Sequence, residues 1–171
     1  MMSEPTTDFR SIILHLSESR IEFIVIGGLA GIAHGAGRMT YDVDVVYRRS
    51  RENIERIVQA FASLEPYLRG APPGLPFKFD FATVRMGLNF TLITKLGQVD
   101  LLGEVAGGGT YESLTPHAEM REVFDVRVPC VNLEKLIELK RAAGRPKDFE
   151  PIAELEAIRQ ERLSGRTDFQ P

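Results

Sequence analysis

The sequence predicts an α/β fold, of the α+β kind, in which a mixed sheet is flanked by helices. Residues 24–26 are continuous and β-branched, as expected of a strand that is buried on both faces. Residues 89–94 and 98–102 resemble two strands joined around Leu96-Gly97, which is typical of a hairpin. Four further segments carry apolar residues at helical spacing. Strands and helices therefore alternate along the chain, as in layered α/β proteins.

Each helical segment has one apolar face that can pack on the sheet. Thr7 or Asp8 can cap the first helix, Ser50 precedes the second and Asn132 the third. The apolar faces are Phe9, Ile12, Ile13 and Leu16 in the first; Ile54, Ile57, Val58, Phe61 and Leu64 in the second; Leu133, Leu136, Ile137 and Leu139 in the third; and Ile152, Leu155, Ile158 and Leu163 in the fourth.

Other segments of the chain are expected to form loops, a turn and an edge strand between these elements. Ala71–Pro76 is too rich in proline for regular structure, and Gly107–Gly109 predicts a flexible loop. Tyr111–Leu114 is expected to form a short turn. Val123–Val131 is expected to form a strand near the sheet edge, where Pro129 is tolerated.

The chain is long enough for one good core and too short for two large domains. We expect residues 1–131 to form that core and residues 132–163 to form a C-terminal helical hairpin that completes the same domain. Gly144 closes the first helix of the hairpin, and residues 145–148 open the second. Residues 164–171 are expected to be a polar tail.

Charge and cysteine content narrow the function classes. The formal net charge is −3 at pH 7, so no global basic field favours a polynucleotide substrate. The single cysteine, Cys130, rules out an intramolecular disulfide framework. No leading hydrophobic segment resembles a signal peptide or a membrane span. We therefore expect a cytoplasmic protein with no membrane partner.

Gly27-Gly28 follows the buried strand and precedes a helix of small residues. Unpaired N–H groups at a helix N-terminus attract anions, and the absence of a side chain at Gly28 would let a phosphate approach them. The alternative is that the glycines only make a tight strand-to-helix turn. The glycines alone do not decide between these interpretations.

Asp42-Val43-Asp44 is the strongest chemical signal in the sequence. In an extended strand the two aspartates share a face, roughly 7 Å apart at the backbone. Paired carboxylates suit a hard divalent ion that is also held by substrate phosphates. The alternative is a solvated strand end. If the chain is extended from Arg38 onward, Arg38 and Thr40 join the same face and extend a polar ridge beside the phosphate site.

These residues carry a resemblance to a known family. The ordered set Gly27-Gly28, His34-Gly35, Arg38, Thr40, Asp42 and Asp44 resembles the signature of the nucleotidyltransferase superfamily, which has the polymerase-β-like fold. Within it, the chain is most similar to small bacterial nucleotidyltransferases related to abortive-infection toxin–antitoxin toxins. The resemblance spans residues 22–155 and is most specific in the first third.

The resemblance implies a site for a nucleoside triphosphate and two Mg²⁺ or Mn²⁺ ions. Asp42 and Asp44 would bind the ions, and a third acidic residue on a later strand would complete the site. Asp100, a strand aspartate in a hairpin, is where the resemblance places this third carboxylate, on a strand next to that of the aspartate pair. Asp80 is the rival candidate.

Further residues follow from the same resemblance. Gly27 and Gly28 would lie near the triphosphate, and Lys140 and Lys147 would face the nucleotide from the C-terminal hairpin. The alternative for this basic pair is a helix connection with an aspartate ion pair. His34 is expected to make a structural hydrogen bond rather than to act in catalysis.

Two functions from different classes result. The favoured one is transfer of a nucleoside monophosphate from a nucleoside triphosphate to a hydroxyl on a small molecule, a protein or RNA, with release of pyrophosphate. The alternative is a non-catalytic nucleotide-binding or partner-binding module of a toxin–antitoxin-type pair, with an antitoxin-type protein partner. A Rossmann fold is disfavoured because the third fingerprint glycine is missing and the acidic residue falls short of the usual spacing of about 20 residues.

Overall fold

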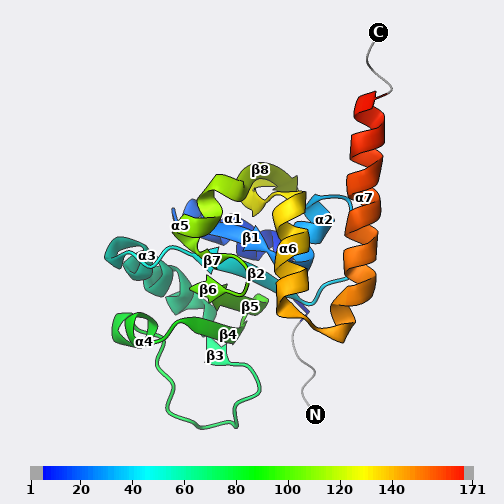
Figure 1. The fold of residues 1–171 in the computed structure, drawn as a ribbon. Helices are drawn as coiled ribbons and strands as arrows, with labels where there is room; N and C mark the ends of the chain where they lie inside the picture. The colour runs from blue at the N-terminus through cyan, green and yellow to red at the C-terminus, as the bar shows by residue number, and fades with distance from the viewer. Residues whose placement is uncertain (1–5, 168–171) are drawn as a thin grey trace.

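The computed structural model describes residues 6–167 of the 171-residue chain. Within this range the main sheet has seven strands in the order β3-β4-β5-β2-β1-β9-β8 (Figure 1). The pairs β2–β5 and β1–β9 are parallel and the other neighbours are antiparallel, so the sheet is mixed, as predicted. The strands are β1 (Phe23–Ile26), β2 (Asp42–Tyr47), β3 (Tyr67–Leu68), β4 (Asn89–Thr94), β5 (Gly97–Leu102), β8 (Ala118–Val123) and β9 (Val126–Val131); β6 (Glu104–Val105) and β7 (Gly109–Thr110) form a separate pair.

The helices pack in two groups. Helix α1 contacts α3, β2 and β9, whereas α6 contacts both α2 and α7. None of the helices in the described range is long and apolar enough to span a membrane. The helices are α1 (Phe9–Glu18), α2 (Gly27–Ala33), α3 (Arg51–Phe61), α4 (Phe81–Met86), α5 (Tyr111–Leu114), α6 (Leu133–Ala143) and α7 (Phe149–Thr167), with 3-10 turns at Ala62–Leu64, Thr115–His117 and Pro146–Asp148.

The predicted helix caps are confirmed. Asp8 Oδ1 accepts the backbone N–H of Ser11 at the start of α1, and Asn132 Oδ1 accepts that of Lys135 at the start of α6. Gly144 ends α6 in the left-handed conformation, with φ +64°. These side chains satisfy backbone groups that the helix ends would leave unpaired.

Helix α7 differs from the prediction in its second half. Leu155 is fully buried and Ile152 and Ile158 are partly buried, but Leu163 is half exposed. The reason is that α7 extends beyond the body of the sheet as it runs toward Thr167 (Figure 1). The predicted polar tail therefore begins as helix at residues 164–167, and residues 168–171 lie outside the described range.

The predicted strand over residues 123–131 is wrong in its extent, although its position near the sheet edge is right. Phe124 and Asp125 adopt positive φ values and form a two-residue turn between β8 and β9. The strand that carries Pro129 is β9, which lies inside the sheet, and β8 is the edge. Proline is accommodated because β9 pairs with β1 at one position, Val25 with Cys130, so few ladder bonds are affected.

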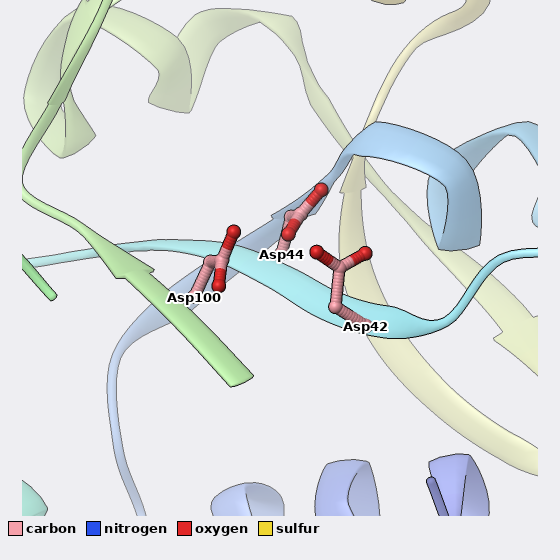
Figure 2. A group of neighbouring side chains, drawn as sticks. All are labelled: Asp42, Asp44 and Asp100. Carbon is pink, nitrogen blue, oxygen red and sulfur yellow. The ribbon is translucent and has the colours of Figure 1, made fainter. Parts of the chain in front are cut away.

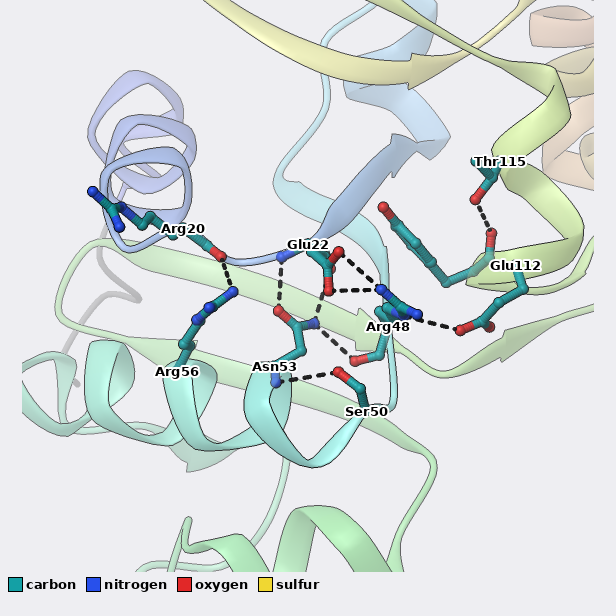
Figure 3. Close-up of polar contacts among 9 residues, drawn as sticks. Arg20, Glu22, Arg48, Ser50, Asn53, Arg56, Glu112 and Thr115 are labelled. Atoms are coloured by element: carbon teal, nitrogen blue, oxygen red, sulfur yellow. Dashed lines mark hydrogen bonds and ion pairs between the residues drawn. The ribbon is translucent and has the colours of Figure 1, made fainter.

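A buried amide fixes the end of β2 against α3. The side chain of Asn53 accepts the N–H of Glu22 at 2.7 Å and donates to the carbonyls of Glu22 and Arg48 at 3.0 and 2.8 Å (Figure 3). Arg48 also pairs with Glu22 and Glu112. This network anchors the end of the β1–β2 pair where β1 begins and β2 ends, and it engages Arg48 in structural contacts.

Candidate active site

Three carboxylates converge where β2 and β5 run side by side. Asp44 and Asp100 hold paired register positions, and each of Asp42, Asp44 and Asp100 offers a carboxylate oxygen, all within 4.8 Å of one another (Figure 2). The alternation of a strand sends Val43 and Val99, which are fully buried, to the opposite face. The structure thus brings together the three aspartates that the sequence analysis selected.

Asp80, the rival third carboxylate, has a different position. It is the N-cap of α4, where its Oδ1 accepts the backbone N–H of Thr83 at 2.9 Å. It is not part of the acidic group that Asp42, Asp44 and Asp100 form. A local capping role therefore accounts for Asp80.

Asp44 is the carboxylate of this triad whose pKa is most strongly raised. Burial, followed by the charges of Asp42 and Asp100, raises its pKa well above the usual value. Its Oδ1 is buried and has no hydrogen-bond partner among the described residues. Burial also raises the pKa of Asp100, although the Arg69 guanidinium opposes this shift. An orphaned buried oxygen among three carboxylates fits a hard divalent cation, because such ions take oxygen ligands.

Arg69 is a member of the site that sequence analysis missed. Its Nη2 donates to Asp100 Oδ1 at 2.6 Å and to the carbonyl of Leu92 at 3.1 Å, and its Nη1 lies 3.6 Å from Asp42 Oδ2. Arg69 directly follows β3, a strand of only two residues. Such a short strand leaves no periodic signal in the sequence, so nothing there indicated an arginine beside the triad.

The two glycines are required by close contacts with site residues. Gly27 has φ +68°, and a Cβ at this position would lie 2.2 Å from Asp44 Oδ2. A Cβ on Gly28 would lie 2.7 Å from both Cβ and Oγ1 of Thr40. The pair therefore makes a tight turn that lets α2 approach the triad closely. This packing role stands whether or not a phosphate binds there.

Arg38 does not join the predicted ridge with the aspartates, whereas Thr40 lies beside Asp42, with its Oγ1 3.4 Å from Asp42 Oδ1. Strand β2 begins only at Asp42, so residue 38 is not part of an extended face. Arg38 instead pairs with Glu150 and Glu154 of α7, at 3.2 and 3.1 Å. Thr40 stays near the site, since its Oγ1 donates to the backbone carbonyl of Asp42 at 3.3 Å.

A cavity of about 350 Å³ opens beside the triad. Lys140 lines it with a side chain that is 12% exposed, and Lys140 Nζ lies 3.9 Å from Asp148 Oδ1. Burial lowers the pKa of Lys140, while Asp148 and Asp44 oppose this shift. The lining is otherwise largely apolar; it comprises Ile26, Gly27, Asp44, Asn89, Asp100, Leu102, Glu104, Val105, Ala106, Leu136, Leu139, Lys140, Ala143 and Arg145.

Lys140 also lines a smaller cavity of about 110 Å³, together with Gly28, Arg38 and Thr40. Lys147 lines neither of these two cavities, whereas its neighbour Arg145 lines the larger one. Arg145 also pairs with Asp148 at 2.7 Å. Of the two predicted lysines, only Lys140 thus lines a cavity beside the triad. The helix connection also contains an ion pair with an aspartate, Asp148.

His34 makes the structural contacts that were expected of it. Its ring is buried, and Nε2 bonds to the carbonyl of Val131 at 2.8 Å while Nδ1 accepts from Arg162 at 3.2 Å. Burial lowers the pKa of His34, which favours the neutral ring. The histidine joins α2, β9 and α7 and lies outside the carboxylate triad.

The sequence matches no protein-family model and no curated protein sequence. Solved structures, however, share the fold. The lincosamide antibiotic adenylyltransferase LnuA, with lincomycin bound, is similar with a TM-score of 0.59 and 12% identity over 92% of this chain and 99% of that chain. A candidate nucleotidyltransferase from Thermotoga maritima is similar with a TM-score of 0.50 and 14% identity over 91% of each chain. The chain therefore has the polymerase-β-like nucleotidyltransferase fold.

Proposed function

We propose that the protein is a metal-dependent nucleotidyltransferase that moves a nucleoside monophosphate from a nucleoside triphosphate to a hydroxyl acceptor and releases pyrophosphate. The observation that carries the proposal is the carboxylate triad with its orphaned buried oxygen on Asp44, set in a nucleotidyltransferase fold. Fold alone does not specify function, so the chemistry of these residues is what supports the proposal.

Asp42, Asp44 and Asp100 are the residues that would hold the metal. Two Mg²⁺ or Mn²⁺ ions bound there would lower the pKa of the attacking hydroxyl and stabilise the leaving pyrophosphate. Burial and the neighbouring carboxylates raise the pKa of Asp44, so a metal ion that binds this residue would compete with a proton. The buried valines behind β2 hold the two strand aspartates in a fixed register.

Lys140 is the best-placed cation for the triphosphate. It is mostly buried, lines both cavities and is close enough to Asp44 to affect the pKa of that residue. Gly27 lines the larger cavity, and Gly28, Thr40 and Arg38 line the smaller one. Lys147 would take part only if the helix connection moved on binding.

A non-catalytic module of a toxin–antitoxin-type pair, with an antitoxin-type partner, is the second candidate. The observation that favours it is the ion pairing of Arg69 with Asp100 and Asp42, which balances part of the triad charge without any metal. Such a module would bind nucleotide or partner and transfer nothing.

Incubation of the protein with cell extract, Mg²⁺ and each nucleoside triphosphate tests the proposal. Mass spectrometry should detect a small molecule, protein or RNA that gains one nucleoside monophosphate, together with pyrophosphate. The matched control is the Asp42→Asn/Asp44→Asn double variant, in which the new species should be absent. Pyrophosphate release that is equal in both proteins would contradict the proposal and leave the second candidate.

A further inference from the structure

The guanidinium of Arg69 lies against two of the three carboxylates of the triad. Its two terminal nitrogens reach Asp100 at 2.6 Å and Asp42 at 3.6 Å, so the arginine bridges carboxylates from two strands. The side chain is 20% exposed, and Asp42 and Asp100 are 27% and 19% exposed. At such distances and with this limited exposure, charges interact more strongly than they do in bulk water.

The contacts of Arg69 compete with divalent ions for one carboxylate oxygen of Asp42 and one of Asp100. A carboxylate oxygen that binds a metal ion no longer accepts as freely from a guanidinium, and the positive charges of metal and arginine repel one another. Arg69 Nε is buried without a hydrogen-bond partner among the described residues, so the side chain is held chiefly by its terminal nitrogens.

We propose that Arg69 is the resident counter-cation of the carboxylate triad, so that a divalent ion enters the site only by displacing its guanidinium. This inference rests on the proposed metal site. Arg69 then lowers the affinity for free metal and acts as a positioning residue that holds Asp42 and Asp100 in place until the ion arrives. Its displacement also removes a side-chain anchor, though not the backbone bond from Arg69 to Thr91, just before the segment of residues 70–80 that leads to α4.

Mn²⁺ binding without nucleotide tests the proposal directly. The Arg69→Met variant should bind Mn²⁺ at least about tenfold more tightly than the wild-type protein in calorimetry, because no internal cation competes. Arg69→Lys should fall between them, since it keeps the charge but loses the two-pronged geometry. The matched control is Arg51→Met, which removes an 81%-exposed arginine on the surface of α3 and should leave the affinity unchanged.

Trypsin cleavage after Arg69 reports whether the guanidinium of Arg69 is displaced from the triad. In the wild-type protein, Mn²⁺ should increase cleavage after Arg69 relative to cleavage after Lys78, an exposed lysine of the same segment. Equal Mn²⁺ affinity in the Arg69→Met and wild-type proteins, or an unchanged cleavage ratio, would overturn the inference. Loss of Mn²⁺ binding in Asp44→Asn alongside equal affinity in Arg69→Met would leave the proposed metal site intact and overturn only the role of Arg69. Absence of Mn²⁺ binding in all of these proteins would overturn both.

Discussion

Asp44 on β2 and Asp100 on β5 are paired residues of two parallel strands, and each offers a carboxylate oxygen that lies within 4.8 Å of the other. This pairing places two acidic groups together in a partly buried site, where only one of them readily keeps its charge. Asp44 is the one that holds the proton more tightly, because it is more deeply buried and Arg69 favours the ionised form of Asp100. In the proposed function, metal binding would therefore compete with protonation of this pair.

The first prediction concerns Asp44 and pH. Its pKa is raised in the folded protein, so the folded state holds this proton more tightly than the unfolded chain does. Its contribution to stability is therefore complete below the usual value of about 3.8 and is lost as the pH rises through the raised pKa. Asp44→Asn cannot ionise, so in chelator its free energy of unfolding should fall less than that of the wild-type protein as the pH rises.

Denaturant unfolding of both proteins between pH 4 and pH 8, in steps of about 1 pH unit, measures how the free energy of unfolding of each depends on pH. At neutral pH and without metal, the Asp44→Asn variant should be the more stable protein. With Mn²⁺ the wild-type protein should be the more stable one, because only its site binds the ion. Parallel pH profiles of the two proteins in chelator would contradict the assignment of Asp44 as the protonated member of the pair.

The second prediction separates Asp100 from Asp80. Asp100→Asn should lower the rate of nucleotidyl transfer by at least about a hundredfold, because a metal ligand loses its charge. Asp80→Asn is the matched control: asparagine caps helices about as well as aspartate, so stability and transfer should both be retained. Steady-state assays and melting temperatures of both variants provide the measurement. Loss of transfer only in the Asp80 variant would show that the third carboxylate has been misassigned.

Much of this site could be predicted from sequence because its members sit in regular elements. Asp42 and Asp44 belong to a strand whose other face is buried valine, and Asp100 belongs to a hairpin whose two strands have strong periodic signals. Local patterns of this kind determine which face a side chain occupies. The register of Asp44 with Asp100 then follows from the parallel pairing of β2 and β5.

The parts that could not be predicted depend on contacts between distant segments. Arg69 follows a two-residue strand, and its partners lie 27 and 31 positions away in the sequence, so no local pattern marks it. Arg38 was placed on an extended face because its spacing from Asp42 is even, yet α7 supplies two glutamates that bind it instead. Likewise, the turn at Phe124 and Asp125 contains no glycine, so the residue type gave no sign that the strand divides there.

The third prediction concerns Gly28. Gly28→Ala should destabilise the protein by about 1–3 kcal/mol, because the new Cβ would lie 2.7 Å from Thr40 and the core around it must shift. The matched control is Gly165→Ala in α7, where a Cβ would meet nothing within 4 Å. That change should be neutral or stabilising by up to about 1 kcal/mol, as alanine favours helix. Thermal unfolding compares them, and a Gly28→Ala protein as stable as the wild type would show that Thr40 can move aside.

The last prediction distinguishes the two lysines that the family resemblance selected. Lys140→Met should weaken binding of a non-hydrolysable triphosphate with Mg²⁺ by at least about tenfold, because it removes a mostly buried cation from both cavities beside the triad. Lys147→Met should change that affinity by less than about twofold, since surface charges outside a site are screened. Calorimetry on both variants, with melting temperatures as a check on folding, gives the comparison. Because Lys140 also pairs with Asp148, a Lys140→Met protein that melts at a lower temperature but binds the triphosphate normally would assign the lysine to the helix connection alone. A stronger effect of Lys147→Met would instead show that the helix connection closes over the nucleotide, which would move Lys147 toward the site.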